Sequence, residues 1–325
     1  MYRSPNNNMK SIRHQILAGL IAVAATHGTC QQVQASIFVT GIFSGNVAKV
    51  DETTGAFLGN VTTGHHQLSG IAADSQGNLW VGKYGGAAEV YHYSPDGTLL
   101  STTDAISGGG TLSQLAIGPD GNIYAPDFNQ NAVARFSTST GAYLGALGSG
   151  VIGQVSGGLA IESNGRILVG DYSNSSIREL DPTSGALLRT IGAGQAYNVV
   201  SLAVDASGDI FSAGVYGDIH KFSSSGSLLA SASASNGNYD PLAGAAFGPD
   251  GLFYVSEQNT TGNILRFNPS TLAEIGVFTN LGSNISGPSS LAWSSASSSG
   301  APEPATLMLA GVALACVVRI RRRTV

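Results

Sequence analysis

Residues 115–136 read Leu115-Ala-Ile-Gly-Pro-Asp-Gly-Asn-Ile-Tyr-Ala-Pro-Asp-Phe-Asn-Gln-Asn-Ala-Val-Ala-Arg-Phe136, and this unit recurs along the chain. It contains an apolar triplet, a Pro-Asp-Gly-Asn turn, a second apolar run, a polar loop and a third apolar run that ends in an aromatic residue. Short apolar runs bounded by Gly, Asn and Asp are typical of β-strands joined by tight turns. A fourth run follows Thr140-Gly141, so the unit predicts four short strands.

The copies align on the glycine of the turn between the first two predicted strands. Successive glycines are separated by 44, 44, 43 and 43 residues. A period in the forties that carries four strands is typical of a β-propeller blade. The alignment predicts five consecutive blades. Their turn glycines are Gly77, Gly121, Gly165, Gly208 and Gly251.

The two ends of the repeat region complete a sixth blade. Three N-terminal runs match the second, third and fourth strands, and the missing first strand appears downstream as Ser290-Leu-Ala-Trp293. A strand at 289–294 that pairs with the N-terminal strands leaves no open sheet edge in the ring. The sequence therefore predicts an all-β, six-bladed propeller over residues 36–294. The three N-terminal runs are residues 37–39, 47–50 and 55–58.

Residues 1–35 have the pattern of a secretory signal peptide. Lys10 and Arg13 precede a short apolar run, and small residues lead to a cleavage site at Ala35. Met9 is the better candidate for the true start of the chain. The pattern predicts export of the propeller.

The C-terminal end carries a second targeting pattern. A Ser-rich linker, residues 295–301, leads to Pro302-Glu303-Pro304 and then to the apolar run 305–318. The run is short for a transmembrane helix, which needs about twenty residues. We nevertheless predict a transmembrane helix in the segment 302–325, held with its C-terminus on the cytoplasmic side by a basic cluster. That cluster is Arg319, Arg321, Arg322 and Arg323.

This order of proline motif, apolar run and basic cluster resembles a PEP-CTERM sorting signal. The resemblance implies a Gram-negative bacterium and an exosortase-type processing enzyme that acts on the tail. It also implies a transient inner-membrane anchor and an association with exopolysaccharide or biofilm matrix. The alternative is a plain C-terminal membrane anchor.

The charge of the chain excludes one class of function. Residues 36–300 hold eight Lys and Arg against nineteen Asp and Glu, a balance near −11. Nucleic acid binding needs basic residues that neutralise phosphates, so we expect no nucleic acid partner. An acidic body suits an extracellular protein.

The repeat unit also resembles NHL-type six-bladed propellers, over about residues 36–294. The resemblance is carried by residues 120–127 and 164–171. It implies the fold and not the activity, because propellers host lyases, lactonases, hydrolases and pure binding modules. The unit departs from the family where an Arg usually precedes the third strand. That position is Ala132, Ser176 or Asp218 here.

In a propeller, the loops that join the second and third strands share one face with the connections between blades. On this face the sequence places aromatic, amide and carboxylate side chains that suit sugar hydroxyl groups. The alternative is that the Asn and Asp residues only cap their own turns. The candidate ligand-binding residues are His65, His66, Tyr84, Asp127, Asn129, Asp171, Tyr172, Tyr216, Tyr239, Asp240, Glu257 and Asn259.

Three carboxylates, Asp127, Asp171 and Glu257, occupy equivalent positions in their blades. If they converged on the central channel they would suit Ca²⁺, as in the gluconolactonase-type propellers. We favour the interpretation that each carboxylate caps the turn after its own strand. We therefore expect no metal and no cofactor, with Ca²⁺ as the alternative.

No catalytic motif stands out in the sequence. We therefore predict a non-enzymatic binding or structural module at the cell surface or in the matrix. Its expected partners are a polysaccharide or a matrix protein. The alternative is a metal-dependent lactonase, lyase or hydrolase.

Overall fold

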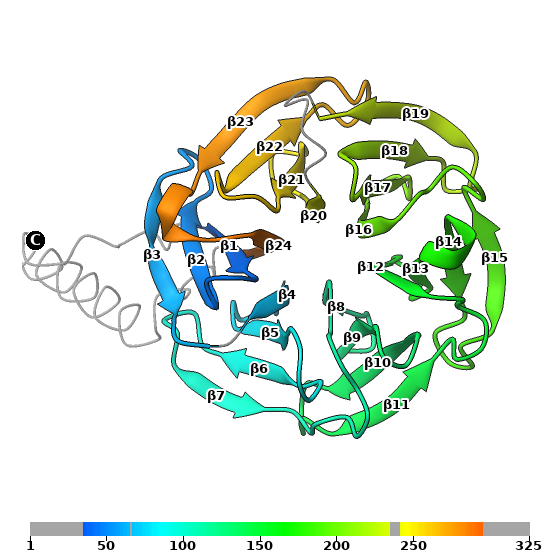
Figure 1. Cartoon of the computed structure of the whole chain (residues 1–325), viewed down its shortest axis with the longest axis horizontal. Coiled ribbons are helices and arrows are strands. Elements are labelled where there is room, and N and C mark those ends of the chain that lie inside the picture. Colours follow the sequence, from blue (N-terminus) through cyan, green and yellow to red (C-terminus); the bar gives the residue numbers. More distant parts are fainter. Residues whose placement is uncertain (1–34, 66, 235–240, 295–325) are drawn as a thin grey trace, which may run out of the picture. The chain divides into compact units, whose positions relative to one another are not determined.

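The computed structural model describes residues 35–65, 67–234 and 241–294. Over these residues, 24 strands form six antiparallel sheets of four strands each, arranged as blades around a central axis (Figure 1). The predicted six-bladed ring is thereby confirmed. The predicted signal peptide and sorting tail lie outside the described residues.

Each blade has its first strand nearest the axis and its fourth strand at the outside (Figure 1). Blade 1 consists of β4 (Leu68–Ala73), β5 (Leu79–Lys83), β6 (Val90–Tyr93) and β7 (Leu99–Thr102). Blade 2 consists of β8 (Ala116–Ile117), β9 (Asn122–Asp127), β10 (Ala132–Ser137) and β11 (Tyr143–Leu147). Blade 3 consists of β12 (Val155–Ile161), β13 (Ile167–Asp171), β14 (Ser176–Leu180) and β15 (Leu187–Ile191).

The remaining blades follow the same plan. Blade 4 consists of β16 (Val199–Val204), β17 (Ile210–Gly214), β18 (Asp218–Phe222) and β19 (Leu228–Ser233). Blade 5 consists of β20 (Leu242–Phe247), β21 (Phe253–Glu257), β22 (Asn263–Phe267) and β23 (Glu274–Asn280). Blade 6 consists of β24 (Pro288–Ser294), β1 (Ser36–Gly41), β2 (Asn46–Asp51) and β3 (Phe57–Thr62).

Blade 6 joins the two ends of the propeller, as the sequence predicts. The antiparallel pairing of β1 with β24 places Ser36 opposite Ser294 and Ile37 opposite Trp293. The inner strand of this blade therefore comes from the C-terminal end, and the other three come from the N-terminal end. Every inter-strand hydrogen bond at this junction helps to keep the ring closed.

The hydrophobic core lies between the blades. Among the described residues, six clusters of buried side chains each join two neighbouring sheets. The cluster between blades 1 and 2, for example, contains Trp80, Ile123 and Phe136. Burial of a large apolar side chain contributes about 1.5–3 kcal/mol. Because each cluster needs both of its sheets, a blade is stable only beside its neighbours.

Side-chain hydrogen bonds shape the Pro-Asp-Gly turns. In the turn between β8 and β9, Gly121 has a φ of +77°, which favours glycine, and its N–H donates to the Gly118 carbonyl at 2.9 Å. The Asp120 carboxylate accepts from the Tyr124 hydroxyl at 2.8 Å. Burial, together with this bond to Asp120, raises the pKa of Tyr124 to about 12. The turn is thus closed by atoms within seven residues of each other, from Gly118 to Tyr124.

Turns between third and fourth strands dock onto the preceding blade. Gly97 has a φ of +91°, and a Cβ atom there would lie 1.9 Å from the Val61 carbonyl oxygen of β3. At the blade 5 to blade 6 junction, the Thr279 hydroxyl donates to the Gly55 carbonyl at 2.6 Å. These contacts hold the outer strands in place, as the core clusters hold the inner ones.

The structure also contains two 3-10 helices, η1 (Tyr172–Asn174) and η2 (Gly282–Asn284). Within the described ranges, no helix has the length and apolar character needed to cross a membrane. The predicted transmembrane segment lies outside these ranges.

Candidate functional site

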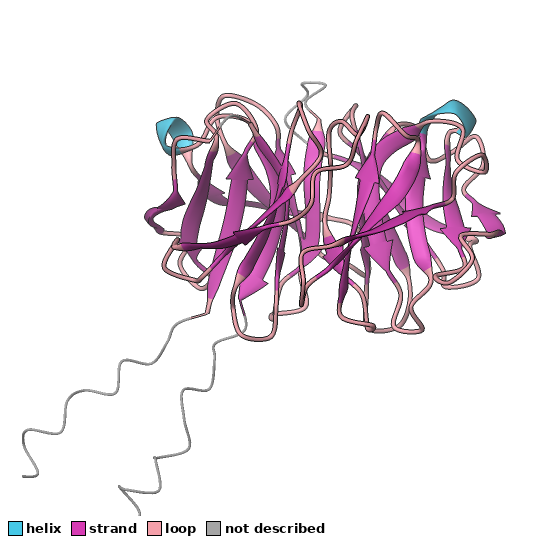
Figure 2. Ribbon diagram, turned by 90° about the horizontal axis from the view of Figure 1, so that it is seen from below, coloured by secondary structure: helices cyan, strands magenta, loops and turns pink. Residues whose placement is uncertain are grey.

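The propeller has two faces with different kinds of connection. Turns that join the first strand to the second, or the third to the fourth, form what we call the turn face. Connections that join the second strand to the third, or one blade to the next, form what we call the loop face. In the side view of Figure 2 the loop face is uppermost and carries the two short helices.

The strand boundaries define both faces. The loop face comprises residues 42–45, 84–89, 128–131, 172–175, 215–217 and 258–262 within blades, and the described parts of 63–67, 103–115, 148–154, 192–198, 234–241 and 281–287 between blades. The turn face comprises residues 52–56, 74–78, 94–98, 118–121, 138–142, 162–166, 181–186, 205–209, 223–227, 248–252 and 268–273.

One backbone hydrogen bond recurs in all six blades and fixes the start of each loop within a blade. The N–H of the first residue after the second strand donates to a carbonyl in the connection that enters the blade, at 2.7–3.3 Å. The loops therefore begin from equivalent, anchored positions. The donors and acceptors are Ile42 and Gly287, Tyr84 and Gln67, Phe128 and Thr111, Tyr172 and Gln154, Val215 and Asn198, and Gln258 and Pro241.

Exposed aromatic side chains gather on these anchored loops. Five of the six blades carry one at the anchored position or one residue later, and a sixth aromatic lies in the connection between blades 3 and 4. Their exposed fractions run from 37% to 65%, and no other Phe, Tyr or Trp among the described residues is as exposed. We call this set the aromatic rim. It consists of Phe43, Tyr84, Phe128, Tyr172, Tyr197 and Tyr216.

Asp127 is buried beneath the rim. Its Oδ1 atom accepts hydrogen bonds from the N–H groups of Asn129 at 2.9 Å, Gln130 at 3.3 Å and Gly110 at 3.3 Å. The side chain has no solvent exposure. Asp127 therefore braces the loop that carries Phe128 against the connection that enters blade 2.

Asp171 has the same role in blade 3, with more partners. Its Oδ2 atom forms an ion pair with Arg178 Nε at 2.7 Å and accepts from Asn174 Nδ2 at 2.7 Å. The N–H groups of Gly153 and Gln154 also donate to this carboxylate. Burial opposes ionisation, but these hydrogen bonds, led by Arg178, outweigh it and lower the pKa of Asp171. Asp171 is therefore an ionised carboxylate that holds the loop beginning at Tyr172 in place.

Glu257 completes the set of three equivalent carboxylates. It is buried at the end of β21, and its Oε2 atom accepts from Asn263 Nδ2 at 2.7 Å. The three carboxylates remain in three separate blades and make hydrogen bonds there. Across the described ranges, no three His, Cys, Asp or Glu side chains gather closely enough to hold a metal ion. Asp127 caps the loop after its own strand, both Asp127 and Asp171 bind the connection that enters their blade, and Glu257 binds the Asn263 side chain.

Some of the other predicted residues of this face are packed or hydrogen-bonded, and others are exposed. His65 packs against Tyr91 and Tyr93 of β6, and its Nε2 atom lies 2.7 Å from the Tyr93 hydroxyl. Burial lowers the pKa of His65. Asn259 caps its own loop, because its Oδ1 atom accepts from two nearby N–H groups, whereas the Asn129 side chain is exposed. Three predicted residues, His66, Tyr239 and Asp240, lie outside the described residues.

Gln114 crosses the central channel, and sequence reasoning did not single it out. Its Oε1 atom accepts from the N–H groups of Leu159 and Leu202, both at 2.9 Å. Its Nε2 atom donates to the carbonyls of Leu202 at 2.8 Å and Ala245 at 3.4 Å. One amide thus joins blades 2, 3, 4 and 5. The other five blades have Gly or Ser at this position, namely Gly70, Gly158, Ser201, Gly244 and Ser290, and that contrast was the available signal.

A shallow axial well of about 400 Å³ lies next to Gln114. Apart from Gln114, the side chains around it are apolar, and they include those of Leu115, Phe247 and Trp293. None of its lining residues carries a titratable side chain. The well therefore offers no general acid, general base or carboxylate ligand.

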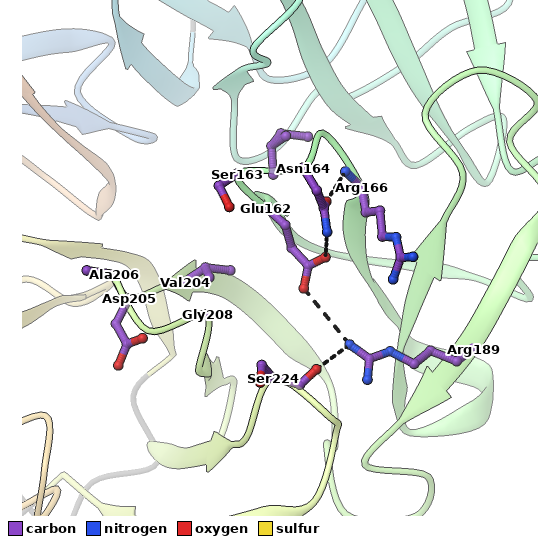
Figure 3. Close-up of a pocket in the computed structure, with 11 residues that line it drawn as sticks. Glu162, Ser163, Asn164, Arg166, Arg189, Val204, Asp205, Ala206, Gly208 and Ser224 are labelled. Carbon is purple, nitrogen blue, oxygen red and sulfur yellow. Dashed lines mark hydrogen bonds and ion pairs between the residues drawn. The ribbon is translucent and has the colours of Figure 1, made fainter.

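A second pocket, of about 480 Å³, lies on the turn face between blades 3 and 4 (Figure 3). In it, Arg189 donates to the Ser224 carbonyl at 2.7 Å and lies 3.9 Å from Glu162 Oε1. Arg189 and Arg166 also bind the buried carboxylate of Glu179. Both arginines are thus held by acidic partners of the protein itself.

Both ends of the described chain are on the turn face. Ala35 and Ser294 line one pocket of about 650 Å³, together with the turn residues Asp74 and Pro249. The segment that follows Ser294 therefore starts from the face opposite the aromatic rim.

The fold is a six-bladed propeller, and the loops on its loop face differ from one blade to the next. The PEP-CTERM protein-sorting motif matches residues 301–323, as the order of motifs in the tail predicts. This motif implies bacterial export and sorting to the cell envelope by an exosortase-type system. No curated protein matches the chain.

Solved structures share the propeller fold. One is a protein of unknown function from Bacteroides caccae, with 16% identity and a TM-score of 0.61, over 80% of this chain and 98% of that chain. A chain of a nidogen/laminin complex has 11% identity and a TM-score of 0.62, over 81% and 99%. Virginiamycin B lyase from Staphylococcus aureus has 13% identity and a TM-score of 0.51, over 74% of both chains. At these identities the likeness concerns the fold alone.

Proposed function

We propose that this chain is an exported, non-enzymatic binding module of the cell surface or extracellular matrix, and that its loop face binds matrix polysaccharide. The observation that carries the proposal is the aromatic rim. Aromatic side chains are large, lose little conformational entropy on binding and combine an apolar ring with a polar edge in Tyr. Sugars present the matching combination of C–H faces and hydroxyl groups.

The anchored loops support the same proposal. Because the first residue of each loop within a blade is held by a hydrogen bond, five of the six aromatic side chains of the rim lie at or next to a fixed backbone position. Preorganised side chains lower the entropy cost of binding. The buried carboxylates of Asp127 and Asp171 add to this rigidity.

The position of the sorting tail determines which face of an anchored propeller points away from the membrane. The tail follows Ser294 on the turn face, and residues 295–301 span at most about 25 Å when fully extended. A chain anchored by its tail before processing in a Gram-negative envelope then presents the aromatic rim away from the inner membrane. Release by an exosortase-type enzyme delivers the propeller to the matrix.

An enzyme with a central divalent metal is the alternative function. It needs several carboxylates that point into one pocket, together with a titratable group next to the substrate. The lack of titratable side chains in the axial well and the separate hydrogen-bond sets of Asp127, Asp171 and Glu257 favour binding over catalysis.

The test uses the full chain in detergent micelles and native gels that contain matrix polysaccharide extracted from the producing bacterium. The variant Tyr172→Ala/Tyr197→Ala removes two aromatic side chains from loops joined by the Gly194 N–H to Ser175 carbonyl bond of 3.0 Å. We expect its apparent affinity to fall by about tenfold or more.

The matched control is Leu188→Ala/Leu229→Ala, which removes two side chains of comparable exposure from the outer strands of the same blades. This control should migrate as the wild type does. Equal retardation of the aromatic variant and the control contradicts the proposal, as does the absence of retardation in the wild type.

A further inference from the structure

The charges of the loop face show which kind of polysaccharide it fits. Of the eight Lys and Arg residues between 36 and 300, only Lys83 and Arg178 reach this face. Lys83 Nζ lies 2.8 Å from Glu89 Oε1, and Arg178 Nε lies 2.7 Å from Asp171 Oδ2. Each cation is thus neutralised by a carboxylate of the protein.

The other six basic residues serve the flanks and the turn face. Lys49, for example, lies over the Phe38 ring at 5.9 Å, and Lys221 pairs with Asp209 at 3.0 Å. The two gaps in the described residues add no Lys or Arg, because they contain only His66 and the sequence Ser-Asn-Gly-Asn-Tyr-Asp at 235–240. The loop face therefore has no Lys or Arg that lacks a carboxylate partner of the protein.

Most of the described carboxylates of this face are buried or lie beside a basic side chain. Asp127 and Glu257 are fully buried, and Asp218 lies 3.2 Å from His220. Asp104, which is exposed, lies at the outer edge, where it accepts from the Tyr143 N–H at 3.3 Å. The described surface around the aromatic rim therefore carries little unpaired charge, although the body as a whole is acidic.

An acidic ligand fits this surface poorly. A uronic acid carboxylate that docks against aromatic rings loses hydration, and no cation of the protein replaces it. The negative charge of the whole body also slows the approach of a polyanion. An uncharged sugar chain has no carboxylate to dehydrate and is not repelled by the acidic body. Its hydroxyl groups suit the tyrosine edges of the rim.

We infer that the ligand of the loop face is an uncharged glycan, one without uronate, sulfate or phosphate groups. This inference rests on the proposed function and narrows it to a substrate class. It also implies that binding is insensitive to salt, because no ion pair forms between the protein and the ligand.

The test compares two forms of one polymer. Polygalacturonate and its carboxyl-reduced form have the same linkages and differ in charge, and matrix polysaccharide separated by anion exchange into neutral and acidic fractions provides the natural pair. The full chain in micelles, with the Tyr172→Ala/Tyr197→Ala variant beside it, is run through native gels that contain each probe at low and high salt.

We expect retardation by the neutral matrix fraction, unchanged by salt and reduced by about tenfold in the aromatic variant. Carboxyl reduction should strengthen any binding of polygalacturonate. Tyrosine-dependent binding of the acidic fraction in preference to the neutral one overturns the inference and leaves the proposed function standing. No tyrosine-dependent retardation by either fraction overturns both.

Discussion

The turn face and the loop face arise from the same repeat, yet they place their carboxylates differently. On the turn face, Asp181 is partly exposed and accepts from the N–H groups of Thr183 and Ser184, two and three residues away. On the loop face, Asp171 is buried and accepts from Gly153 and Gln154, eighteen and seventeen residues away. A local cap stabilises one turn, whereas a buried brace joins separate segments. This difference explains why the turns repeat and the loops vary.

Removal of a buried brace should have the largest effect. Asp171→Ala leaves Arg178 without its partner in a site where this side chain is 14% exposed. Loss of one member of a buried pair costs about 3–5 kcal/mol, so we expect the Tm to fall by about 6–15 °C. Thermal unfolding followed by far-UV circular dichroism measures this shift. The paired variant Asp181→Ala should change the Tm by no more than about 2 °C, and equal shifts for the two variants contradict the distinction between brace and cap.

Substitution of Gln114 in the central channel should cause the next largest loss of stability. Gln114→Ala leaves the N–H groups of Leu159 and Leu202 without their acceptor. We expect a loss of about 2–4 kcal/mol and a Tm lower by about 4–10 °C.

Ser201→Ala is the control for the channel variant, because it alters the same level of the channel. The Ser201 hydroxyl is buried and has no hydrogen-bond partner in the described part of the chain. Its removal should leave the Tm unchanged or raise it. A Gln114→Ala protein as stable as the Ser201→Ala protein shows that water replaces the amide at no cost.

Acid should weaken the turn face gradually. Hydrogen bonds from the Thr54 N–H lower the pKa of Asp51, and those from the Ser184 N–H lower the pKa of Asp181. A carboxylate whose pKa is lower in the folded state stabilises the fold above its unfolded value, near 4, and loses this contribution as pH falls through the folded pKa. The Tm should therefore be lower at about pH 3 than at about pH 6. A Tm that stays constant or rises on acidification contradicts this assignment.

The sequence predicted the fold because its signals are local. Each Pro-Asp-Gly turn is closed by atoms within a few residues, as Asp120 and Tyr124 show, and the same pattern returns every 43 or 44 residues. The split blade was predictable for the same reason, since Ser290-Leu-Ala-Trp293 matches an inner strand wherever it stands.

The candidate site was predictable only in part. Tyr84, Tyr172 and Tyr216 were found because they follow recognisable strands, whereas Phe43 was missed although it follows β1 as Tyr216 follows β17. The role of Gln114 depends on the meeting of four blades, so no single repeat reveals it. Spacing places Asp127 at the end of a strand, but it does not reveal that the N–H of Gly110, in the connection that enters the blade, also donates to its carboxylate.

The pairing of β1 with β24 also makes closure of the ring the last step in the folding of the propeller. Residues 36–62, which form β1 to β3, are synthesised first, yet the inner strand of their blade is β24, the last element before the sorting tail. The ring therefore cannot close until the whole propeller segment, up to and including β24, is available for folding. A chain truncated before Pro288 would stay open, with unpaired strand edges at the junction. Because the sorting motif at 301–323 directly follows the closing strand, any full-length chain that carries the tail also carries the strand that completes the ring.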